Sequence, residues 1–599
     1  MKRTRVPSVV PSERPPQARA AKPGAVEPGA VEPGAVEPGA AEHGAAEPGA
    51  AEPGARRSRV TKAVVALAVL GLTAVGLVGC SSSGSTPGAS GGGSGGASAA
   101  GGPSSTDTAS NPAATTLQPL PTAIPADLQP YYDQKLSWHG CDSGFQCTTF
   151  KVPLDYDHPG AAGGGDLTLS AVRKQATGQG VTRMGSLLVN PGGPGGSAVD
   201  YAEYAAMTYP AVVRAAYDVV GVDPRGVDRS APVQCLTDAQ MDAYTQVNTT
   251  PTTQAGVSAL VAADKGFAQA CAKQSGKLLS HVSTVESARD MDVLRALLGD
   301  DKLHYLGKSY GTFLGATYAG LFPSKVGTMV LDGAMNPSLN AQQLNAQQAG
   351  GFQVAFDAFA ADCVKRPGCA LGNGTVAQAN QKLDAFFKSL DANPLPTGDP
   401  RKLNEALGMT GVISAMYDPS EWPSLRLALA DAVNNGNGKE LLALSDQYYE
   451  RDPSGHYQNL MYANAAVNCL DLPAAATSPS QVQQQLPSYE KSSPQFGASL
   501  AWGGLTCAYW PVKASGSPHV IPAKGAAPIL VVGTTRDPAT PYEWAEGLAQ
   551  QLDTGTLLTF DGDGHTAYAR DPGGSACIDN AVNNYLLQGT VPAKGTVCH

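Results

Sequence analysis

The 599-residue sequence predicts an α/β fold with a mostly parallel central sheet and helices on both of its faces. Short runs of β-branched and aliphatic residues alternate along the chain with segments of helical periodicity, which is the pattern of repeated βαβ units. A hydrophobic content of 42% supports a sizeable core. The chain is too long for one ordinary domain, so we expect flexible segments beside one large folded body.

Residues 1–55 consist largely of a five-residue repeat of the type Gly-Ala-Val-Glu-Pro. The repeat has no aromatic residue, and a proline in nearly every unit prevents regular structure. We interpret this segment as a disordered cytoplasmic extension, or as the product of a start codon assigned too far upstream.

Residues 56–80 have the features of a secretory signal, with basic residues, then an apolar run, then small residues. The final Leu-Val-Gly before Cys80 resembles the lipobox of bacterial lipoproteins, in which the cysteine carries the lipid after cleavage. A single-span signal anchor is the alternative. Both interpretations predict a catalytic body outside the cytoplasmic membrane, either lipid-anchored to its outer face or secreted. A Ser/Gly-rich linker over residues 81–116 follows.

The folded body is predicted in two parts, residues 117–335 and 516–599, separated by a helical cap over residues 336–515. In the cap the strand signals fade, and Gln- and Ala-rich helical segments replace them. The strand candidates are short apolar runs at residues 167–172, 186–190, 219–222, 303–306, 329–331, 529–532 and 556–560. Helices are expected at residues 285–298 and 310–322, on either side of the fourth of these strands.

Cysteine usage indicates an oxidising compartment. The sequence contains 11 cysteines, and setting Cys80 aside leaves an even number that could close five disulfides. Pairing of sequence neighbours is the simplest arrangement, with unpaired buried thiols as the alternative: Cys141–Cys147, Cys235–Cys271, Cys363–Cys369, Cys469–Cys507 and Cys577–Cys598. No C-x-x-C spacing occurs, so no metal site is expected. The formal net charge of −10 gives no reason to expect a nucleic-acid partner.

The pattern G-x-S-x-G occurs three times, twice by composition alone around Ser90 and Ser94 in the linker. The third match, centred on Ser309, follows an apolar run and precedes a helical segment. This strand–turn–helix setting is that of a nucleophile elbow, which predicts the α/β-hydrolase fold with Ser309 as the nucleophile. A Gly-rich turn whose serine only caps the helix is the alternative.

A serine hydroxyl needs a base, and in this fold the chain order is serine, acid, histidine. Of the three histidines beyond the cap, His565 follows the last predicted strand between small residues, whereas His519 precedes a strand and His599 is the final residue. The acid should end the preceding strand, where Asp537 stands. The alternative for Asp537 is a pair with Arg536 or a cap on the next helix.

The oxyanion that develops in such a reaction needs two backbone N–H donors. One is expected from Tyr310, directly after the nucleophile. The other is expected from Gly193, in the Gly-Gly-Pro-Gly-Gly loop that follows an early strand, since only glycine lets a backbone approach a substrate closely. A plain Gly-rich turn is the alternative for this loop.

Together these motifs resemble the tripeptidyl aminopeptidase family, exported relatives of proline iminopeptidase within the α/β-hydrolases. The resemblance spans roughly residues 117–598 and rests on segments 190–197, 222–230, 307–311, 533–538 and 564–565, with a similar C-terminal region around Trp502 and Cys507. Proline iminopeptidases have a histidine before their Gly-Gly-Pro-Gly, where this chain has Pro191. That departure favours the tripeptidyl branch.

The resemblance implies that a peptide substrate enters with its free N-terminus under the cap. A partly buried ammonium needs a carboxylate partner. Asp471 near the end of the cap is the candidate, and Glu421 and Glu450 stay open as alternatives; a solvated surface role for Asp471 is equally open.

The leading hypothesis is therefore an exported serine exopeptidase that releases tripeptides and needs no cofactor. An exported esterase or lipase, or a proline iminopeptidase-like peptidase, would use the same triad. A non-catalytic lipoprotein that binds peptides is the alternative from another class, although such a protein has no need of a complete Ser-His-Asp set.

Overall fold

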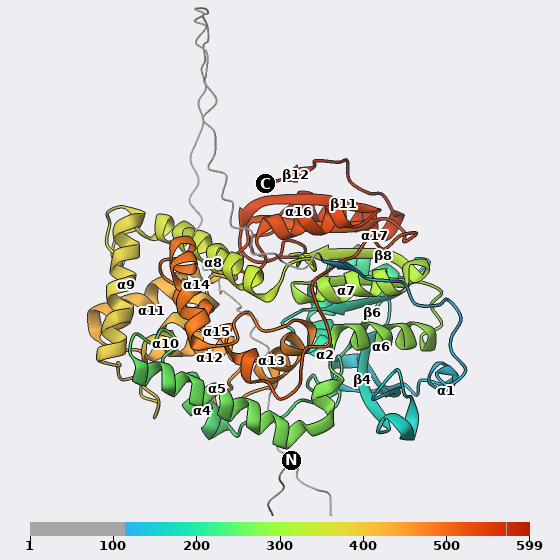
Figure 1. The fold of residues 1–599 in the computed structure, drawn as a ribbon. Helices are drawn as coiled ribbons and strands as arrows, with labels where there is room; N and C mark the ends of the chain where they lie inside the picture. Colours follow the sequence, from blue (N-terminus) through green and yellow to red (C-terminus); the bar gives the residue numbers. More distant parts are fainter. Residues whose placement is uncertain (1–113, 571) are drawn as a thin grey trace, which may run out of the picture. The chain divides into compact units, whose positions relative to one another are not determined.

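A ten-stranded sheet forms the centre of the described chain, residues 114–570 and 572–599 of the computed structural model (Figure 1). Its strands are β2 (His139–Gly140), β3 (Gln146–Pro153), β4 (Asp166–Lys174), β5 (Gly185–Asn190), β6 (Tyr217–Val222), β7 (Leu303–Lys308), β8 (Val326–Asp332), β10 (Ile529–Arg536), β11 (Gly555–Asp563) and β12 (Val597–Cys598). They lie in the order β12-β11-β10-β8-β7-β5-β6-β4-β3-β2. β1 (Thr115–Thr116) and β9 (His519–Val520) form a separate parallel pair.

The pairing is parallel from β6 to β12, whereas β2, β3 and β4 are antiparallel to one another and β4 is antiparallel to β6. All seven predicted strands are present, as β4 to β8, β10 and β11. Every residue of β5 and β6 is buried, which explains their continuous apolar runs. The prediction missed β3, because an edge-side strand alternates buried and exposed residues and so lacks such a run.

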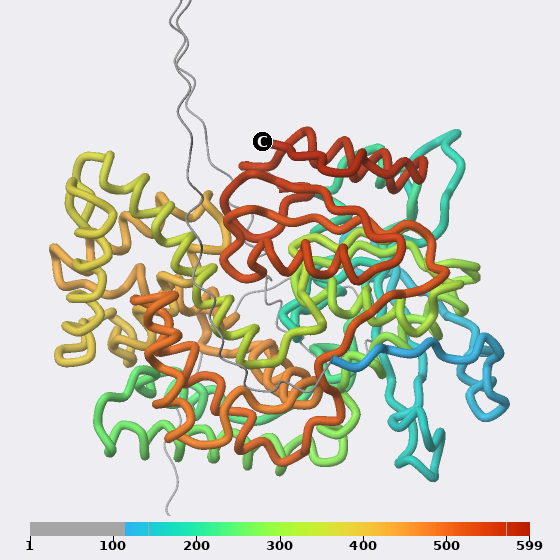
Figure 2. Tube along the Cα trace, turned by 45° about the horizontal axis from the view of Figure 1, so that its top comes forward, coloured from blue at the N-terminus to red at the C-terminus, as the bar shows by residue number. Residues whose placement is uncertain are grey.

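Helices cover both faces of the sheet, as the predicted α/β-hydrolase fold requires. On one face α6 (Thr284–Leu297), α7 (Tyr310–Leu321) and α16 (Tyr542–Gln551) pack into the main core cluster. On the other face α2 (Ala198–Thr208), α3 (Ala211–Ala216) and α17 (Ala576–Gln588) pack against the strands in a second cluster. Figure 2 shows the C-terminal segment in red lying beside the light-green strand and helix segments of the central chain.

The chain between β8 and β10 contains mainly helices, as predicted for a cap. They are α8 (Ala341–Cys363), α9 (Val376–Ala392), α10 (Glu405–Ser414), α11 (Trp422–Asn435), α12 (Lys439–Tyr448), α13 (Leu460–Asp471), α14 (Pro479–Ser492) and α15 (Gly497–Gly503). Helices α8 to α12 enclose a core of their own, which includes Phe356 and Phe359. The cap is therefore a packed body and not an extended flap.

The cap has a second component that the sequence analysis assigned to the sheet domain. Helices α4 (Asp238–Thr245) and α5 (Gln254–Ser275) leave the sheet after β6 and run along the cap helices (Figures 1 and 2). Val257 and Leu260 of α5 pack in one cluster with Trp502 of α15. Asp242 of α4 pairs with Arg451 at 2.9 Å.

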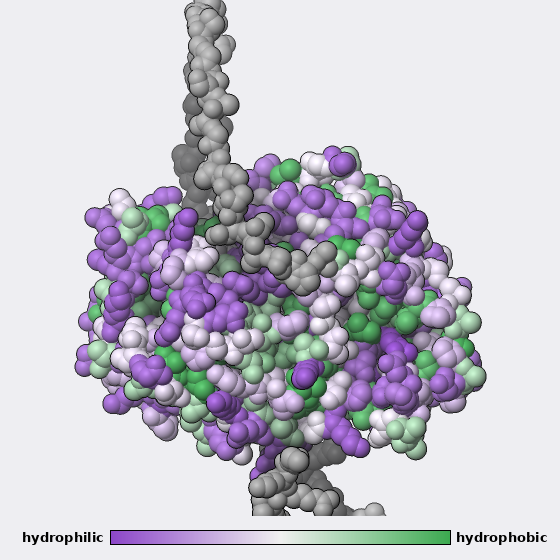
Figure 3. Space-filling view, viewed as in Figure 1, coloured by the Kyte–Doolittle hydropathy of each residue, from purple (hydrophilic) through white to green (hydrophobic). Residues whose placement is uncertain are grey.

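All five predicted disulfides are present in the described residues, with sequence neighbours paired. Five disulfides fit an oxidising, extracytoplasmic compartment. Among the described residues, no helix has the length and apolar content needed to cross a membrane. On the face drawn in Figure 3, the described hydrophobic side chains are scattered among hydrophilic ones. The predicted repeat over residues 1–55, the signal segment with Cys80, and nearly all of the 81–116 linker lie outside the described residues.

Candidate active site

Ser309 stands at a sharp turn between β7 and α7, as an elbow motif predicts. Its φ of 57° and ψ of −127° are unusual for a residue with a side chain. The flanking glycines make the turn possible: a Cβ atom at Gly307 would lie 2.3 Å from the carbonyl oxygen of Gly311. The backbone N–H of Ser309 donates to the carbonyl of Asp332 at 3.0 Å, which anchors the turn to the neighbouring strand.

Asp537 and His565, predicted from separate strand ends, lie together. Asp537 directly follows β10, and His565 lies two residues beyond β11. The imidazole Nδ1 is 2.8 Å and 3.0 Å from the two carboxylate oxygens of Asp537. A carboxylate oxygen can only accept, so Nδ1 carries a proton, and in the neutral imidazole Nε2 is the acceptor.

The Asp537 carboxylate is buried and fully engaged. It accepts hydrogen bonds from the backbone N–H groups of Ala539, Thr540 and Thr566 at 2.9, 2.8 and 3.1 Å. These donors fix the carboxylate plane toward the imidazole. The alternative pairing with Arg536 is wrong, because that side chain pairs with Asp561 and Asp563.

The second imidazole nitrogen of His565 is free. Nε2 is buried and has no hydrogen-bond partner within the described chain. That part of the chain also shows no hydrogen bond from His565 to Ser309 Oγ. Contacts of this kind tighten in an enzyme when substrate binds.

The Gly-rich loop after β5 lies against the elbow. A Cβ atom at Gly192 would be 2.8 Å from Ser309 Cβ and 2.9 Å from the backbone nitrogen of Tyr310. Gly192 donates its own N–H to the Asn190 side chain at 2.9 Å. Among the described residues, the backbone N–H groups of Gly193 and Tyr310 have no acceptor. Gly193 is exposed, whereas Tyr310 is buried.

Asp332, which the sequence analysis missed, holds the loop that carries His565. This fully buried carboxylate ends β8 and accepts from the N–H groups of Ala567 and Tyr568 at 2.9 and 3.0 Å. Lys308, directly before Ser309, lies 3.8 Å from Asp332 and donates to the Tyr568 carbonyl at 2.7 Å. The sequence did contain a signal for Asp332, because an aspartate at the end of a buried apolar strand resembles Asp537, which directly follows one.

Asp223 does the same for the Gly-rich loop. It follows β6, is fully buried, and accepts from Ser197 Oγ at 2.7 Å and from the Val199 N–H at 3.0 Å. Two residues on, the buried Arg225 forms a two-pronged pair with Asp290 of α6, with both bonds at 2.7 Å. The Asp-Pro-Arg-Gly motif therefore ties the loop after β5 to the core.

The cap touches the histidine loop directly. The carbonyl of Tyr417 accepts the His565 N–H at 2.8 Å, and the Tyr417 ring meets the imidazole edge-on with ring centroids 5.4 Å apart. Asp418 lies 3.4 Å from Arg570. A Cβ atom at Gly564 would lie 2.6 Å from Pro419. The sequence offered no signal for this contact, because 148 residues separate the partners (565 − 417).

Asp471, the predicted partner of a substrate amine, lies in the interior, where its carboxylate is already bonded within the protein. Its two carboxylate oxygens accept from the N–H and the hydroxyl of Thr284, at 2.9 and 2.5 Å. Burial raises the pKa of Asp471 to about 7, against the lowering effect of these two bonds. The structure thus gives this carboxylate a partner inside the protein.

Glu450, one of the alternatives to Asp471, is exposed and not buried. Its side chain reaches solvent, yet protein surrounds it closely enough that burial, followed by the charges of Asp200 and Asp228, raises its pKa to about 7. No hydrogen bond or ion pair of its carboxylate occurs among the described residues. Glu421, the other alternative, lies at the start of α11.

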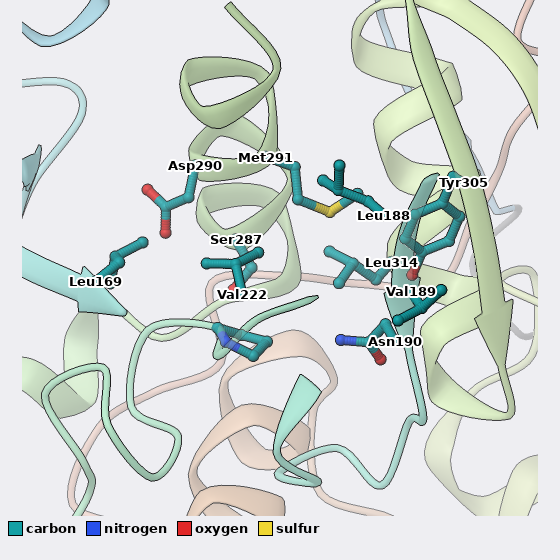
Figure 4. A pocket seen from close by; sticks show the side chains of 11 residues that line it. Leu169, Leu188, Val189, Asn190, Val222, Ser287, Asp290, Met291, Tyr305 and Leu314 are labelled. Carbon is teal, nitrogen blue, oxygen red and sulfur yellow. The ribbon is translucent and has the colours of Figure 1, made fainter. Parts of the chain in front are cut away.

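The internal cavity shown in Figure 4 is a separate feature. It is lined mainly by aliphatic side chains of β4 to β7, α6 and α7, with Asn190 and Ser287 among them. Neither Ser309 nor His565 lines it. It therefore lies in the core behind the Gly-rich loop and is not the place where the candidate nucleophile and base meet.

Comparison with known proteins identifies relatives along most of the chain. Residues 493–598, which include Asp537 and His565, match the family described as TAP-like protein. The chain is 39% identical over 499 residues to the serine protease Hip1 of Mycobacterium tuberculosis, covering 78% of this chain and 92% of that protein.

Two further relatives carry other names. A Mycobacterium tuberculosis protein named Carboxylesterase B is 38% identical over 466 residues, covering 76% of this chain and 86% of that protein. The tripeptidyl aminopeptidase of Streptomyces lividans is 32% identical over 488 residues, covering 77% of this chain and 86% of that protein.

The buried Lys308–Asp332 pair gives a first prediction. Asp332→Asn should lower the free energy of unfolding by about 3 kcal/mol, because it leaves an ammonium buried without its carboxylate. Adding Lys308→Met removes the orphaned charge and should recover at least about half of that loss. Denaturant unfolding followed by tryptophan fluorescence measures both changes. A double variant less stable than Asp332→Asn contradicts the pairing.

Proposed function

The chain belongs to the TAP-like family of α/β-hydrolases that includes Hip1 and the tripeptidyl aminopeptidases, and from this premise we propose that it releases tripeptides from free peptide N-termini. The relatives support a serine peptidase of the α/β-hydrolase type. The relatives are named as a serine protease, a carboxylesterase and a tripeptidyl aminopeptidase, all of which are enzymes. The alternative of a non-catalytic peptide-binding lipoprotein is therefore not retained.

One observation carries the proposed chemistry. His565 has Nδ1 bound to a buried carboxylate and Nε2 without a partner in the described chain, while Ser309 occupies a strained elbow at the end of the central strand. This arrangement prepares an imidazole to take a proton and a hydroxyl to lose one. We assign the roles of nucleophile, base and orienting acid to Ser309, His565 and Asp537.

In the acylation step, Ser309 Oγ attacks the carbonyl carbon of the third residue of the peptide while its proton moves to His565 Nε2. Asp537 stabilises the imidazolium that forms. The proton then passes to the nitrogen of the leaving peptide as the C–N bond breaks. Water, deprotonated by the same nitrogen, attacks the acyl-enzyme and releases the tripeptide.

The oxyanion of each tetrahedral intermediate would lie between the N–H groups of Gly193 and Tyr310. Both donors lack an acceptor in the described chain, and both belong to backbone that is fixed by neighbouring bonds. Donors that are already oriented stabilise developing charge without reorganisation.

For the substrate ammonium we propose Glu450 in place of Asp471. Three carboxylates lie close together, those of Glu450, Asp200 and Asp228, and Arg229 pairs with the two aspartates. Arg229 also donates to Ser197, at the end of the Gly-rich loop, at 3.2 Å. The negative cluster therefore lies beside the loop that would bind the oxyanion, and Glu450 is the member whose carboxylate is left without a bond in the described residues.

An esterase is the second candidate, favoured by the relative named Carboxylesterase B. The same three residues would serve ester cleavage, since the chemistry of acylation and deacylation is shared. The two functions differ in whether the free ammonium of the substrate is needed.

A panel of four substrates tests the proposal: a free tripeptide anilide, its N-acetylated form, a proline anilide and a short acyl ester. We expect kcat/KM for the free tripeptide anilide to exceed that of the acetylated form at least about hundredfold, because the acetyl group removes the charge that binds the carboxylate. Equal cleavage of the two forms would falsify the exopeptidase proposal. Faster cleavage of proline anilide would favour the proline iminopeptidase alternative.

Ser309→Ala is the control for this panel. It should remove turnover of every substrate while circular dichroism and the unfolding midpoint stay those of the parent chain. Turnover that survives in the folded variant would exclude Ser309 as the nucleophile.

Glu450 gives a pH prediction. Its carboxyl is protonated and neutral below about pH 7, so KM for the free tripeptide anilide should fall as pH rises through 7, until the substrate amine itself loses its proton near pH 8. Glu450→Gln should raise KM about tenfold and remove this dependence. Glu421→Gln is the matched control and should retain the parent KM profile. An unchanged KM in Glu450→Gln places the amine elsewhere.

Export and lipid attachment form part of the proposal. The five disulfides support an oxidising compartment, and the segment ending at Cys80 supports signal cleavage. Mass spectrometry of the exported chain should show an N-terminal Cys80 that carries a lipid. A chain that retains residues 63–79 would support the signal anchor instead, and an unmodified N-terminus beyond Cys80 would support secretion.

A further inference from the structure

Three helix ends meet beneath the nucleophile elbow. Asp471 is the last residue of α13 in the cap, Thr284 is the first residue of α6, and Tyr310 is the first residue of α7, directly after Ser309. All three side chains are buried. The Thr284 hydroxyl lies 2.5 Å from both the Asp471 carboxylate and the Tyr310 hydroxyl. A continuous hydrogen-bonded chain therefore connects a cap helix to the residue that follows the nucleophile.

The direction of these hydrogen bonds follows from the chemistry of their ends. An ionised carboxylate only accepts, so the Thr284 hydroxyl donates to Asp471 and must accept from the Tyr310 hydroxyl. The Thr284 N–H donates to the other carboxylate oxygen at 2.9 Å. Each polar group in the chain then has a partner. If the residue at 471 becomes a donor, the Thr284 hydroxyl turns toward Tyr310, and the tyrosine O–H loses its acceptor among the described residues.

The cap end of this chain is fixed independently. Cys469, two residues before Asp471, forms a disulfide with Cys507. The carbonyl of Leu470 accepts from the N–H groups of Ser515 and Gly516 at 2.9 and 3.0 Å. Asp471 therefore has little freedom to move with Tyr310.

We propose that Asp471 is a positioning residue which, through the Thr284 hydroxyl, orients the first turn of α7 and with it the backbone N–H of Tyr310 that binds the oxyanion. The proposal rests on the proposed function in one respect, the oxyanion role of that N–H. Asp471 touches neither substrate nor a reacting atom; it acts on the transition state through the elbow.

Two titratable groups face Asp471 from the helices packed on it, Glu286 of α6 and Tyr310 of α7. Glu286 adds to the effect of burial in raising the Asp471 pKa, and burial holds the Tyr310 pKa well above its usual value. The ionised form of Asp471 completes the chain of bonds, so ordering of the elbow should increase as pH rises through about 7.

A double-mutant cycle on kcat for a short acyl ester tests this positioning. Asp471→Asn turns a donor toward Thr284 and should lower kcat about tenfold with KM within about twofold of the parent. Tyr310→Phe removes the hydroxyl at the other end and should lower kcat about threefold. In the double variant the unpaired hydroxyl is absent, so kcat should rise above that of Asp471→Asn and approach that of Tyr310→Phe.

Tyr318→Phe is the matched control, because it removes another buried hydroxyl of α7, one that bonds to Asp292 at 3.0 Å and is not part of this chain. Combined with Asp471→Asn, it should give no recovery. The proposal is overturned if the fold-losses in kcat of Asp471→Asn and Tyr310→Phe simply multiply in the double variant. It is also overturned if Tyr318→Phe restores the kcat of Asp471→Asn as well as Tyr310→Phe does.

The ester readout separates this result from the proposed function. It needs Ser309 and the oxyanion donors but no substrate ammonium, so peptide specificity does not enter it. If the parent chain cleaves the ester and the cycle is additive, the positioning role fails alone. If the parent chain cleaves the ester but not the tripeptide anilide, the exopeptidase proposal fails and the cycle still decides the role of Asp471.

Discussion

Three buried aspartates at the carboxyl ends of parallel strands organise the candidate site. Asp223 follows β6, Asp332 ends β8 and Asp537 follows β10. Each is an ionisable group without access to water, so each must be satisfied by hydrogen bonds from the protein, and loop N–H groups supply them. Asp223 thereby holds the end of the Gly-rich loop, and Asp537 and Asp332 hold successive residues of the loop that carries His565. Only Asp537 also receives an imidazole.

The cap takes part in the site and does more than cover it. The Tyr417 carbonyl accepts the backbone N–H of His565, on the side of the candidate base. Asp471 reaches Tyr310 through Thr284, on the side of the candidate nucleophile. These contacts make the arrangement of the candidate catalytic groups depend on how the cap packs. In a family whose members carry the names protease and esterase, such contacts offer a route by which changes in the cap can alter the chemistry without changing Ser309, His565 or Asp537.

Prediction from sequence succeeded where a local pattern has one physical meaning. The buried strands β5 and β6 appear as unbroken apolar runs because helices cover both of their faces. It failed where the pattern is shared between environments. β3 alternates like any half-exposed segment, and α5 has the same amphipathic pattern whether it packs on a sheet or, as observed, on the cap.

The sequence alone predicted the α/β class and the elbow at Ser309, and it indicated Asp537 and His565 as the candidate acid and base in that chain order. These predictions depend on glycine backbone freedom and on where the apolar strands end, and both are local features of the sequence. The tertiary structure alone decided the partners of the carboxylates. Asp471 was predicted to bind a substrate amine, but it meets Thr284, which is 187 residues away along the chain. Whether a carboxylate is left free or bonded depends on how distant helices pack, and no local pattern records that.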